Sequence, residues 1–380
     1  MKLKSITYSQ FQGEKGEWEI NKLTLVPINL LVGKNTSGKT RILNIIGNLG
    51  NLLAGDLKPA FLSGNYNATF ELGGKTLKYI LVYRDSKVVK EEVTFNGKKV
   101  IKRGRGGRGE ILFEKTNKYV QFQTPQNELA VVARRDSVQH SFLEPLYRWG
   151  QSIRHFYFGT PMGRENFAII AKDRTMDFNP KDTSKVIQIY RKGITECGET
   201  FKKAILEDMA AIDFPLKDIG IAAPTSIILT TPIAGEVVCM FVKEKDLKGI
   251  TEQPDMSQGM FRTLSIIIQL NYSQMTSKQN CILVDDIGEG LDFDRSCALI
   301  ELLMRKLKRP SVQLIMATND RFVMNKVPLK AWSLIRRRGG TAEVFNYTNS
   351  KDLFDEFKFT GLNNFDLLAT NFLSEAKMNA

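Results

Sequence analysis

Hydrophobic and polar positions along the first 32 residues follow the pattern of β-strands. Residues 2–9 alternate, residues 18–25 form a second segment, and residues 28–32 are a short, mostly apolar run. A glycine-rich stretch then separates this run from residues 40–53, where apolar side chains recur at helical spacing. The pattern predicts strands, a loop and a helix, in that order.

From about residue 66 to residue 123, short alternating segments are separated by turn signals such as Gly73-Gly74 and Asn96-Gly97. This predicts an antiparallel β arm inserted into a larger domain. The next stretch, residues 126–149, predicts a helix with a break near Pro145.

The second half of the chain alternates between helical and extended patterns. Apolar strands at 281–284 and 312–317 flank a helix at 295–307, which is typical of a parallel sheet. The other predicted elements are a strand at 153–158, a helix at 184–209, a strand pair at 225–230 and 236–242, and a helix at 259–271.

The chain has 380 residues, which suits a core domain with large insertions. No apolar run reaches the roughly 18 residues needed to cross a bilayer, and the start has no signal-peptide core, so we expect a cytoplasmic protein that does not enter a membrane. The four cysteines form no CxxC pair, so a structural zinc site is not expected. The net charge of +13 is compatible with a polyanionic partner.

Residues 33 to 40, GKNTSGKT, match the phosphate-binding loop G-x-x-x-x-G-K-[ST], between a predicted strand and a predicted helix. Glycines let the backbone curl so that its N–H groups point at phosphate oxygens. We expect Lys39 to reach the β- and γ-phosphates of ATP and the Thr40 hydroxyl to bind Mg²⁺. The predicted nucleotide-binding residues of this loop are Gly33, Lys34, Asn35, Thr36, Ser37, Gly38, Lys39, Thr40 and Arg41.

Residues 281 to 292, CILVDDIGEGLD, place two acids at the end of an apolar strand. Asp285 is predicted to hold Mg²⁺, directly or through water, and Asp286 to orient or deprotonate the attacking water. Glu289 is an alternative base, but it lies where the loop is expected to turn away, so a solvated glutamate is the simpler interpretation.

Three further segments carry a resemblance to a known family. Gly290-Leu291-Asp292 resembles the D-loop of ABC ATPases, where it follows the Walker B strand. Residues 256–262, MSQGMFR, resemble the ABC signature, with Ser257 and Gly259 at the family's serine and second glycine. Residues 314–320, LIMATND, resemble the switch strand, with Asn319 where the family usually has histidine. The phosphate loop, the signature, the Walker B strand with its D-loop, and the switch strand also occur in the family's order.

The resemblance, over about residues 1–55 and 220–345, implies an α/β fold: a P-loop ABC-type ATPase head with an inserted antiparallel β arm and a helical insertion. Within that class the chain resembles the SMC-like branch and the ATPases of overcoming-lysogenization-defect nucleases, many of which serve bacterial anti-phage systems. The expected segments are a first core part (1–65), the β arm (66–125), a mostly helical insertion (126–215), a second core part (216–345) and a C-terminal extension (346–380).

The resemblance also implies a homodimer with two composite ATP sites. Ser257 would contact the nucleotide held by the partner's loop, Gly259 would line the same contact, and Asp292 would organise the boundary. The catalytic residues would be Lys39, Asp286 and Asn319.

Two positions depart from the family. Asp286 replaces the usual glutamate and is one methylene shorter, and Asn319 can donate a hydrogen bond but cannot become charged. We therefore expect slow hydrolysis and a long-lived ATP-bound state. The family's glutamine loop has no distinctive match; Gln121, Gln123 and Gln126 are candidates.

Residues 98–108, KKVIKRGRGGR, are strongly basic, and two interpretations stay open: contact with the backbone of DNA or RNA, or a solvated hairpin tip. The basic side chains are Lys98, Lys99, Lys102, Arg103, Arg105 and Arg108. No aromatic residue lies among them, so base stacking is not indicated.

Three functions follow from these patterns. The first is an ATPase switch that controls a separate effector, such as a nuclease or toxin, in anti-phage defence. The second is a DNA-maintenance ATPase of the SMC or recombination-mediator kind. The third is an ATP-gated scaffold that scarcely hydrolyses ATP.

Overall fold

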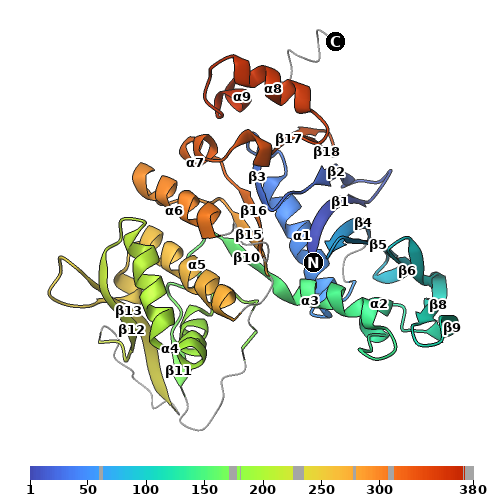
Figure 1. Cartoon of the computed structure of the whole chain (residues 1–380), viewed down its shortest axis with the longest axis horizontal. Coiled ribbons are helices and arrows are strands. Elements are labelled where there is room, and N and C mark those ends of the chain that lie inside the picture. The colour runs from blue at the N-terminus through green and yellow to red at the C-terminus, as the bar shows by residue number, and fades with distance from the viewer. Residues whose placement is uncertain are drawn as a thin grey trace. The chain divides into compact units, whose positions relative to one another are not determined.

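The computed structural model describes residues 1–59, 63–170, 178–179, 181–225, 235–276, 280–306, 312–370 and 372. The chain forms two compact units. Unit 1 contains Met1–Ile153, Cys281–Leu283 and Val312–Ala380, and unit 2 contains Arg154–Asn280 and Val284–Ser311. Each is described by itself (Figure 1).

A single mixed sheet forms the centre of unit 1 (Figure 1). Its strands lie in the order β15-β16-β3-β17-β18-β2-β1-β4-β5-β6-β7-β8-β9. They are β1 (Lys2–Gln10), β2 (Trp18–Thr24), β3 (Ile28–Val32), β4 (Ser63–Leu72), β5 (Lys75–Arg84), β6 (Lys87–Phe95), β7 (Lys98–Arg103), β8 (Arg108–Phe113), β9 (Lys118–Gln123), β15 (Asn280–Asp285, of which Cys281–Leu283 belong to unit 1), β16 (Val312–Ala317), β17 (Trp332–Arg338) and β18 (Thr341–Asn346).

The strand before the phosphate loop lies between two parallel neighbours. Leu30 of β3 pairs with Met316 of β16 on one side and with Trp332 of β17 on the other. Every residue of β3 other than Ile28 is buried, as expected of a central parallel strand with both faces covered. The sequence predicted β3 and β16, but β17 and β18 were not predicted as sheet strands.

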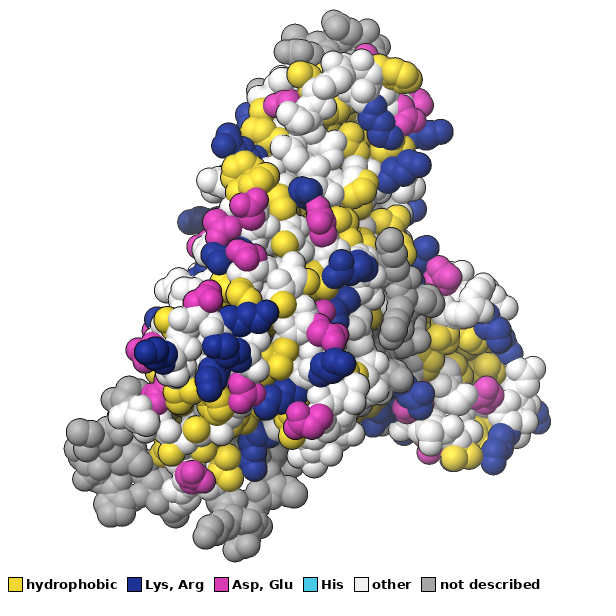
Figure 2. Space-filling view, turned by 60° about the vertical axis from the view of Figure 1, so that its left-hand side comes forward, with side chains coloured by type: hydrophobic (Ala, Val, Ile, Leu, Met, Phe, Trp, Pro, Cys, Tyr) yellow, Lys and Arg dark blue, Asp and Glu magenta, His cyan; other side chains and the backbone are white. Residues whose placement is uncertain are grey.

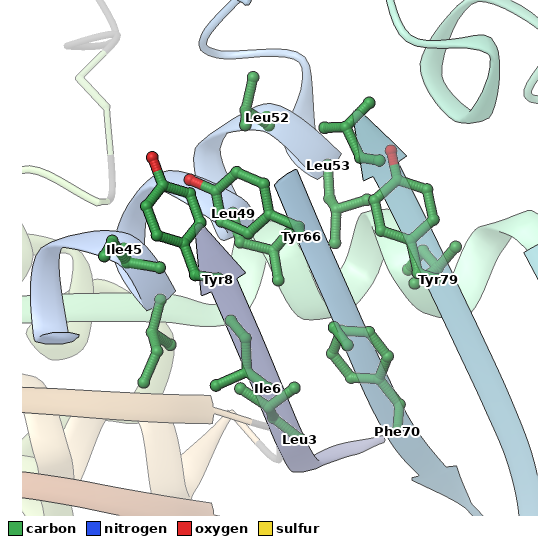
Figure 3. Packing of buried hydrophobic residues seen from close by; sticks show 14 of the residues in the cluster. Leu3, Ile6, Tyr8, Ile45, Leu49, Leu52, Leu53, Tyr66, Phe70 and Tyr79 are labelled. Atoms are coloured by element: carbon green, nitrogen blue, oxygen red, sulfur yellow. The ribbon is translucent and has the colours of Figure 1, made fainter. Parts of the chain in front are cut away.

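Helix α1 (Lys39–Ala54) follows the loop and packs its apolar stripe on the sheet. Ile45, Leu49, Leu52 and Leu53 face side chains of β1, β4 and β5 in one continuous core (Figure 3). The Tyr8 and Tyr66 rings lie 4.7 Å apart within it. The helix thereby fixes the position of the loop at its N-terminus.

The strands predicted as an arm, β4 to β9, continue the same sheet beyond β1 through antiparallel pairs. Glu91 of β6 lies in a fully buried ion pair with Arg103 of β7, with 3.1 Å between Oε2 and Nη1. The Glu91 carboxylate also accepts hydrogen bonds from the N–H groups of Ala130 and Val131, which begin helix α2 (Ala130–Ala133). This ion pair therefore ties the arm to the segment that follows it.

The prediction of a helix over residues 126–149 with a break near Pro145 is wrong in its extent and in the position of the break. The segment contains α2, a short 3₁₀ turn at Ser141–Leu143, and α3 (Glu144–Ser152). Pro145 lies in the first turn of α3, where its missing N–H costs no helical hydrogen bond, so it starts a helix and does not break one.

The C-terminal part of unit 1 contains α7 (Arg321–Lys326), α8 (Lys351–Phe359) and α9 (Asp366–Ala369). Phe354, Phe357 and Leu367 of the C-terminal extension are buried. The amide of Asn364 donates to the Val327 carbonyl oxygen (3.0 Å), which anchors the residues before α9 to the end of α7.

The described residues of unit 2 form β10 from Arg154 onward, a small antiparallel sheet and the α-helices α4, α5 and α6. The elements are β10 (Ile153–Tyr157), β11 (Ala168–Ile170), α4 (Val186–Ala210), β12 (Leu216–Ala222), β13 (Glu236–Glu244), β14 (Thr251–Glu252), α5 (Gln258–Met275) and α6 (Phe293–Lys306). Asp208 of α4, Asn271 of α5 and Lys306 of α6 form a mutually hydrogen-bonded cluster that joins the three helices.

Two predictions in unit 2 need comment. Strand β13 pairs with β11, β12 and β14, while most of the predicted strand at 225–230 lies outside the described residues. Among the residues that the structure describes, no helix is both long and apolar enough to span a bilayer.

Candidate nucleotide site

The phosphate loop in unit 1 leaves no space for side chains at two of its glycines. A Cβ on Gly33 would lie 2.5 Å from the Ile335 carbonyl oxygen and 2.7 Å from Ser37 Oγ. Gly38 has φ of 104°, which L side chains rarely adopt, and a Cβ there would lie 3.1 Å from the Trp18 ring. The curled backbone that the motif predicted is therefore present.

Lys39 lies inside this curl. Its side chain is buried, with 6% of the residue exposed, and Nζ donates to the carbonyl oxygens of Gly33 (2.8 Å) and Lys34 (3.3 Å). Ser37 Oγ is also buried and has no hydrogen-bond partner among the described residues. An ammonium and an orphaned hydroxyl at the N-terminus of a 16-residue helix are donors that suit phosphate oxygens.

A cavity of about 270 Å³ opens beside the loop, within unit 1. Residues 34–37 line one side, β17 contributes Leu334 to Arg337, and α9 contributes Leu367 and Leu368. The C-terminal extension thus reaches the phosphate loop, which the sequence did not indicate.

Arg41 and Trp18 form a second contact next to the loop. The Arg41 guanidinium lies 4.3 Å from the centre of the buried Trp18 ring, a cation–π geometry. Burial lowers the pKa of Arg41, but the group stays charged at neutral pH. Trp18 therefore supports both Gly38 and Arg41, a role that its place in an alternating strand could not reveal.

The acidic turn in unit 2 follows β15. Asp285 is 4% exposed at the strand end, and Asp286 adopts a left-handed backbone with φ of 53°. The N–H of Glu289 donates to the Asp286 carbonyl oxygen (3.1 Å), which closes a tight turn. Aspartate tolerates the left-handed region better than most residues, so this backbone gives a physical reason for aspartate at position 286.

The same turn brings the carboxylate of Glu289 back toward that of Asp286. A Cβ on Gly159 would lie 2.9 Å from Glu289 Oε2 and 3.7 Å from Asp286 Oδ2, so both carboxylates border Gly159. The sequence predicted that the loop would carry Glu289 away. The closed turn, which places residue i+3 beside residue i, is the reason for the difference.

The signature residues begin helix α5. Ser257 is exposed and caps the helix, with Oγ accepting from the Met260 N–H (3.2 Å). A Cβ on Gly259 would lie 2.4 Å from the Gly290 carbonyl oxygen, so the glycine allows the helix start to approach the acidic turn. Arg262, 4% exposed, donates to oxygens of Thr160, Glu289 and Gln258.

Comparison with solved structures identifies the fold of the chain. A crystal structure of an SMC head bound to the C-winged helix domain of ScpA matches 93% of this chain and 99% of that chain, at 13% sequence identity and a TM-score of 0.56. An SMC head domain with an extended coiled coil, bound to the C-terminal domain of ScpA and derived from Pyrococcus furiosus, matches 94% and 99%, at 11% identity and a TM-score of 0.51. The chain has the P-loop ATPase fold of an SMC head. No family model and no curated protein matches its sequence.

In this SMC-head fold, Asp292, which the sequence predicted to lie in a D-loop, caps α6. Its carboxylate accepts from the backbone N–H of Arg295 (3.0 Å) and from Arg295 Nη1 (2.8 Å), and the hydrogen bond from that N–H is the main cause of its lowered pKa. Asp292 is exposed.

The switch segment belongs to unit 1. Asn319 is exposed just after β16, and Asp320 caps α7 by accepting from the N–H groups of Phe322 (2.7 Å) and Val323 (3.4 Å). The cap fixes the backbone directly after Asn319, whose amide remains at the surface.

Two of the three glutamine candidates lie in the unit 1 sheet, and Gln126 lies in the turn that follows β9. Gln121 and Gln123 belong to β9, the last strand of the unit 1 sheet. Within unit 2, the segment that follows β10 contacts the acidic strand instead, because the Phe158 N–H donates to the Asp285 carbonyl oxygen (2.9 Å). No glutamine stands between Tyr157 and Gly163 of this chain.

Two basic side chains of the segment 98–108 are held in ion pairs that the sequence did not indicate. Arg103 is fully buried, and besides its ion pair with Glu91 it donates to the carbonyl oxygens of Pro125 (2.7 Å) and Glu128. Lys99 pairs with Glu92 at 3.2 Å. On the face drawn in Figure 2, basic side chains are interspersed with acidic ones and form no single patch. Arg103 is therefore a structural residue and no candidate for nucleic-acid contact.

Proposed function

We propose that the chain binds ATP with Mg²⁺, hydrolyses it slowly, and acts as a nucleotide-gated homodimeric switch for a separate effector, in anti-phage defence. The observation that carries the proposal is the phosphate loop, where Lys39 Nζ and the orphaned Ser37 Oγ converge inside a curl closed by Gly33 and Gly38. Triphosphate oxygens would replace the carbonyl oxygens that Lys39 now contacts.

The chain's oxygen donors suit Mg²⁺, which prefers carboxylates, hydroxyls and phosphates. Thr40 and Asp285 would hold the ion, which would neutralise charge on the phosphates. Asp286 would orient and deprotonate the attacking water, and Asn319 would donate a hydrogen bond to the γ-phosphate. The short Asp286 side chain and the uncharged Asn319 are the reasons to expect slow turnover.

The dimer part of the proposal rests on the exposed signature start. Ser257 presents its hydroxyl and the N-terminus of an 18-residue helix to solvent, and such a helix end attracts anions. A partner's γ-phosphate is the anion that the ABC resemblance implies. The protein partner ScpA in both similar structures supports a separate protein partner here.

A DNA-maintenance role is the second candidate, supported by the SMC-head fold and the net charge of +13. DNA-stimulated turnover that depends on Lys98, Lys102, Arg105 and Arg108 would favour it. Binding of ATP with no measurable turnover would favour the scaffold.

The test combines nucleotide binding, mass and turnover. We expect the wild-type chain to dimerise with ATP in light scattering after gel filtration and to turn over less than about once per second. Lys39→Ala should remove binding, whereas Ser257→Arg should keep binding and prevent the dimer. Turnover of several per second, or unchanged affinity in Lys39→Ala, would overturn the proposal. Protection of bacteria against phage that is lost in Lys39→Ala tests the defence role.

A further inference from the structure

Arg262 is a buried residue of the signature segment of unit 2, and its side chain donates three hydrogen bonds. Its Nε donates to the Thr160 carbonyl oxygen (2.9 Å), Nη1 to the Glu289 carbonyl oxygen (3.0 Å), and Nη2 to Gln258 Oε1 (3.1 Å). Each of its three nitrogens is thus used, on three different segments. A planar guanidinium can satisfy three such directions at once, whereas an ammonium on a flexible stem cannot hold them in one plane.

Two of these bonds bracket the acidic turn. Glu289 ends the turn that begins at Asp286, and Thr160 follows Gly159, the residue beside which both carboxylates lie. The same side chain therefore fixes the backbone on both sides of these carboxylates. Gly290 makes the approach possible, because a Cβ there would lie 2.8 Å from Arg262 Nη1.

The third bond leads to the start of the signature helix. Gln258 directly follows the exposed cap Ser257, so its link to Arg262 connects the cap to the turn. Gly259 provides a second, steric contact between the same two segments, against the Gly290 carbonyl oxygen. A displacement of the helix start would therefore be transmitted to the turn that carries Asp286.

We propose that Arg262 is a positioning residue that couples the signature helix start to the acidic turn, so that engagement of Ser257 sets the geometry of Asp286 and Glu289. The inference rests on the proposed ATPase function and deepens it. The hydrogen bonds of Arg262 go to Thr160, Glu289 and Gln258. It acts through the two backbone carbonyls and the Gln258 amide that it holds.

Arg164 provides a matched control. It also lies in unit 2 and donates from Nη1 to two backbone carbonyl oxygens, those of Pro254 (2.9 Å) and Met256 (2.7 Å). These bonds hold Pro254 and Met256, the first residue of the signature segment, and do not reach the acidic turn. Substitution of Arg164 therefore perturbs the same region without breaking the link between Gln258 and Glu289.

The experiment compares Arg262→Lys and Arg262→Gln with Arg164→Lys and Arg164→Gln in the full-length chain. Binding of a fluorescent ATP analogue gives Kd, and phosphate release gives kcat. We expect both Arg262 variants to keep Kd within about threefold, because the phosphate loop belongs to unit 1, and to lose about 100-fold in kcat, the typical effect of a misplacement near 1 Å. Both Arg164 variants should keep kcat within about threefold.

A loss limited to kcat distinguishes positioning from general destabilisation, which would also lower the melting temperature and ATP binding. Wild-type kcat in Arg262→Lys and Arg262→Gln would overturn the inference, as would an equal loss in the Arg164 variants. Failure of the proposed function has a different result, since the wild-type chain itself would then show no ATP binding or turnover.

Discussion

Gly259, at the start of the signature helix, packs directly against the backbone of Gly290, because a methyl group at position 259 would lie only 2.4 Å from the Gly290 carbonyl oxygen. The contact joins the start of α5 to the turn that follows β15. It explains in steric terms why a glycine is needed in the signature segment, independently of any contact with nucleotide.

Gly259→Ala should force the helix start away from the turn, and we expect a loss of about 1–3 kcal/mol in the free energy of unfolding, typical of overpacking, together with reduced turnover. Gly249→Ala is the matched control, since no atom lies within 4 Å of its added Cβ. Urea unfolding and phosphate release measure both effects. Equal stabilities for the two variants would contradict the steric role of Gly259.

Asp286 and Glu289 compete for the role of base, and two isosteric variants separate them. We expect Asp286→Asn to lower kcat by about 100-fold or more, the usual contribution of general-base catalysis, with little change in ATP affinity. Glu289→Gln should lower kcat by less than about tenfold. Single-turnover kinetics check the order, and the reverse order would identify Glu289 as the base.

Arg103→Met should destabilise unit 1 by about 3–5 kcal/mol, because it leaves the fully buried Glu91 carboxylate without its cation. Lys99→Met, on the same strand, removes a partly exposed pair with Glu92 and should cost less than about 1 kcal/mol. Urea unfolding followed by circular dichroism measures both. A loss below 1 kcal/mol for Arg103→Met would show that Glu91 does not depend on this ion pair.

Because of His155, we expect the free energy of unfolding to decrease in mild acid. The His155 ring stacks on Tyr157 at 4.1 Å, and burial lowers its pKa to about 4, below the 6.5 of an exposed histidine. Between these values the unfolded chain binds the proton more tightly, so the free energy of unfolding should decrease as pH falls from 6.5, by roughly 1–2 kcal/mol at pH 5. His155→Gln and His155→Phe cannot titrate, so both should flatten this dependence in urea unfolding at pH 7.5 and pH 5. An unchanged slope in both variants would rule out His155 as its source.

Sequence prediction succeeded where the signal is local. Helix α1 and the parallel strands β3 and β16 follow from contiguous motifs and periodicity, and the structure confirms these elements. Phosphate binding by the loop between β3 and α1 stays a prediction. Pro145 was misread because one proline can either end or begin a helix, depending on which turn it occupies. The residue type alone does not distinguish these cases.

Predictions failed where the signal is long-range. Arg103 was counted among exposed cations because its partner Glu91 lies on another strand. Arg262 was quoted as part of the signature without a role, since its acceptors Thr160 and Glu289 are remote in sequence. Packing between segments decides such roles, and one sequence does not display it.

The presence of Leu367 and Leu368 beside residues 34–37 has a practical consequence. A label or a mechanical constraint on α9 would disturb residues 34–37, which are the residues proposed to bind the triphosphate. An environment-sensitive dye attached to α9 would therefore report nucleotide binding at the loop by a change in fluorescence. An affinity tag fused next to α9 would interfere with the same loop.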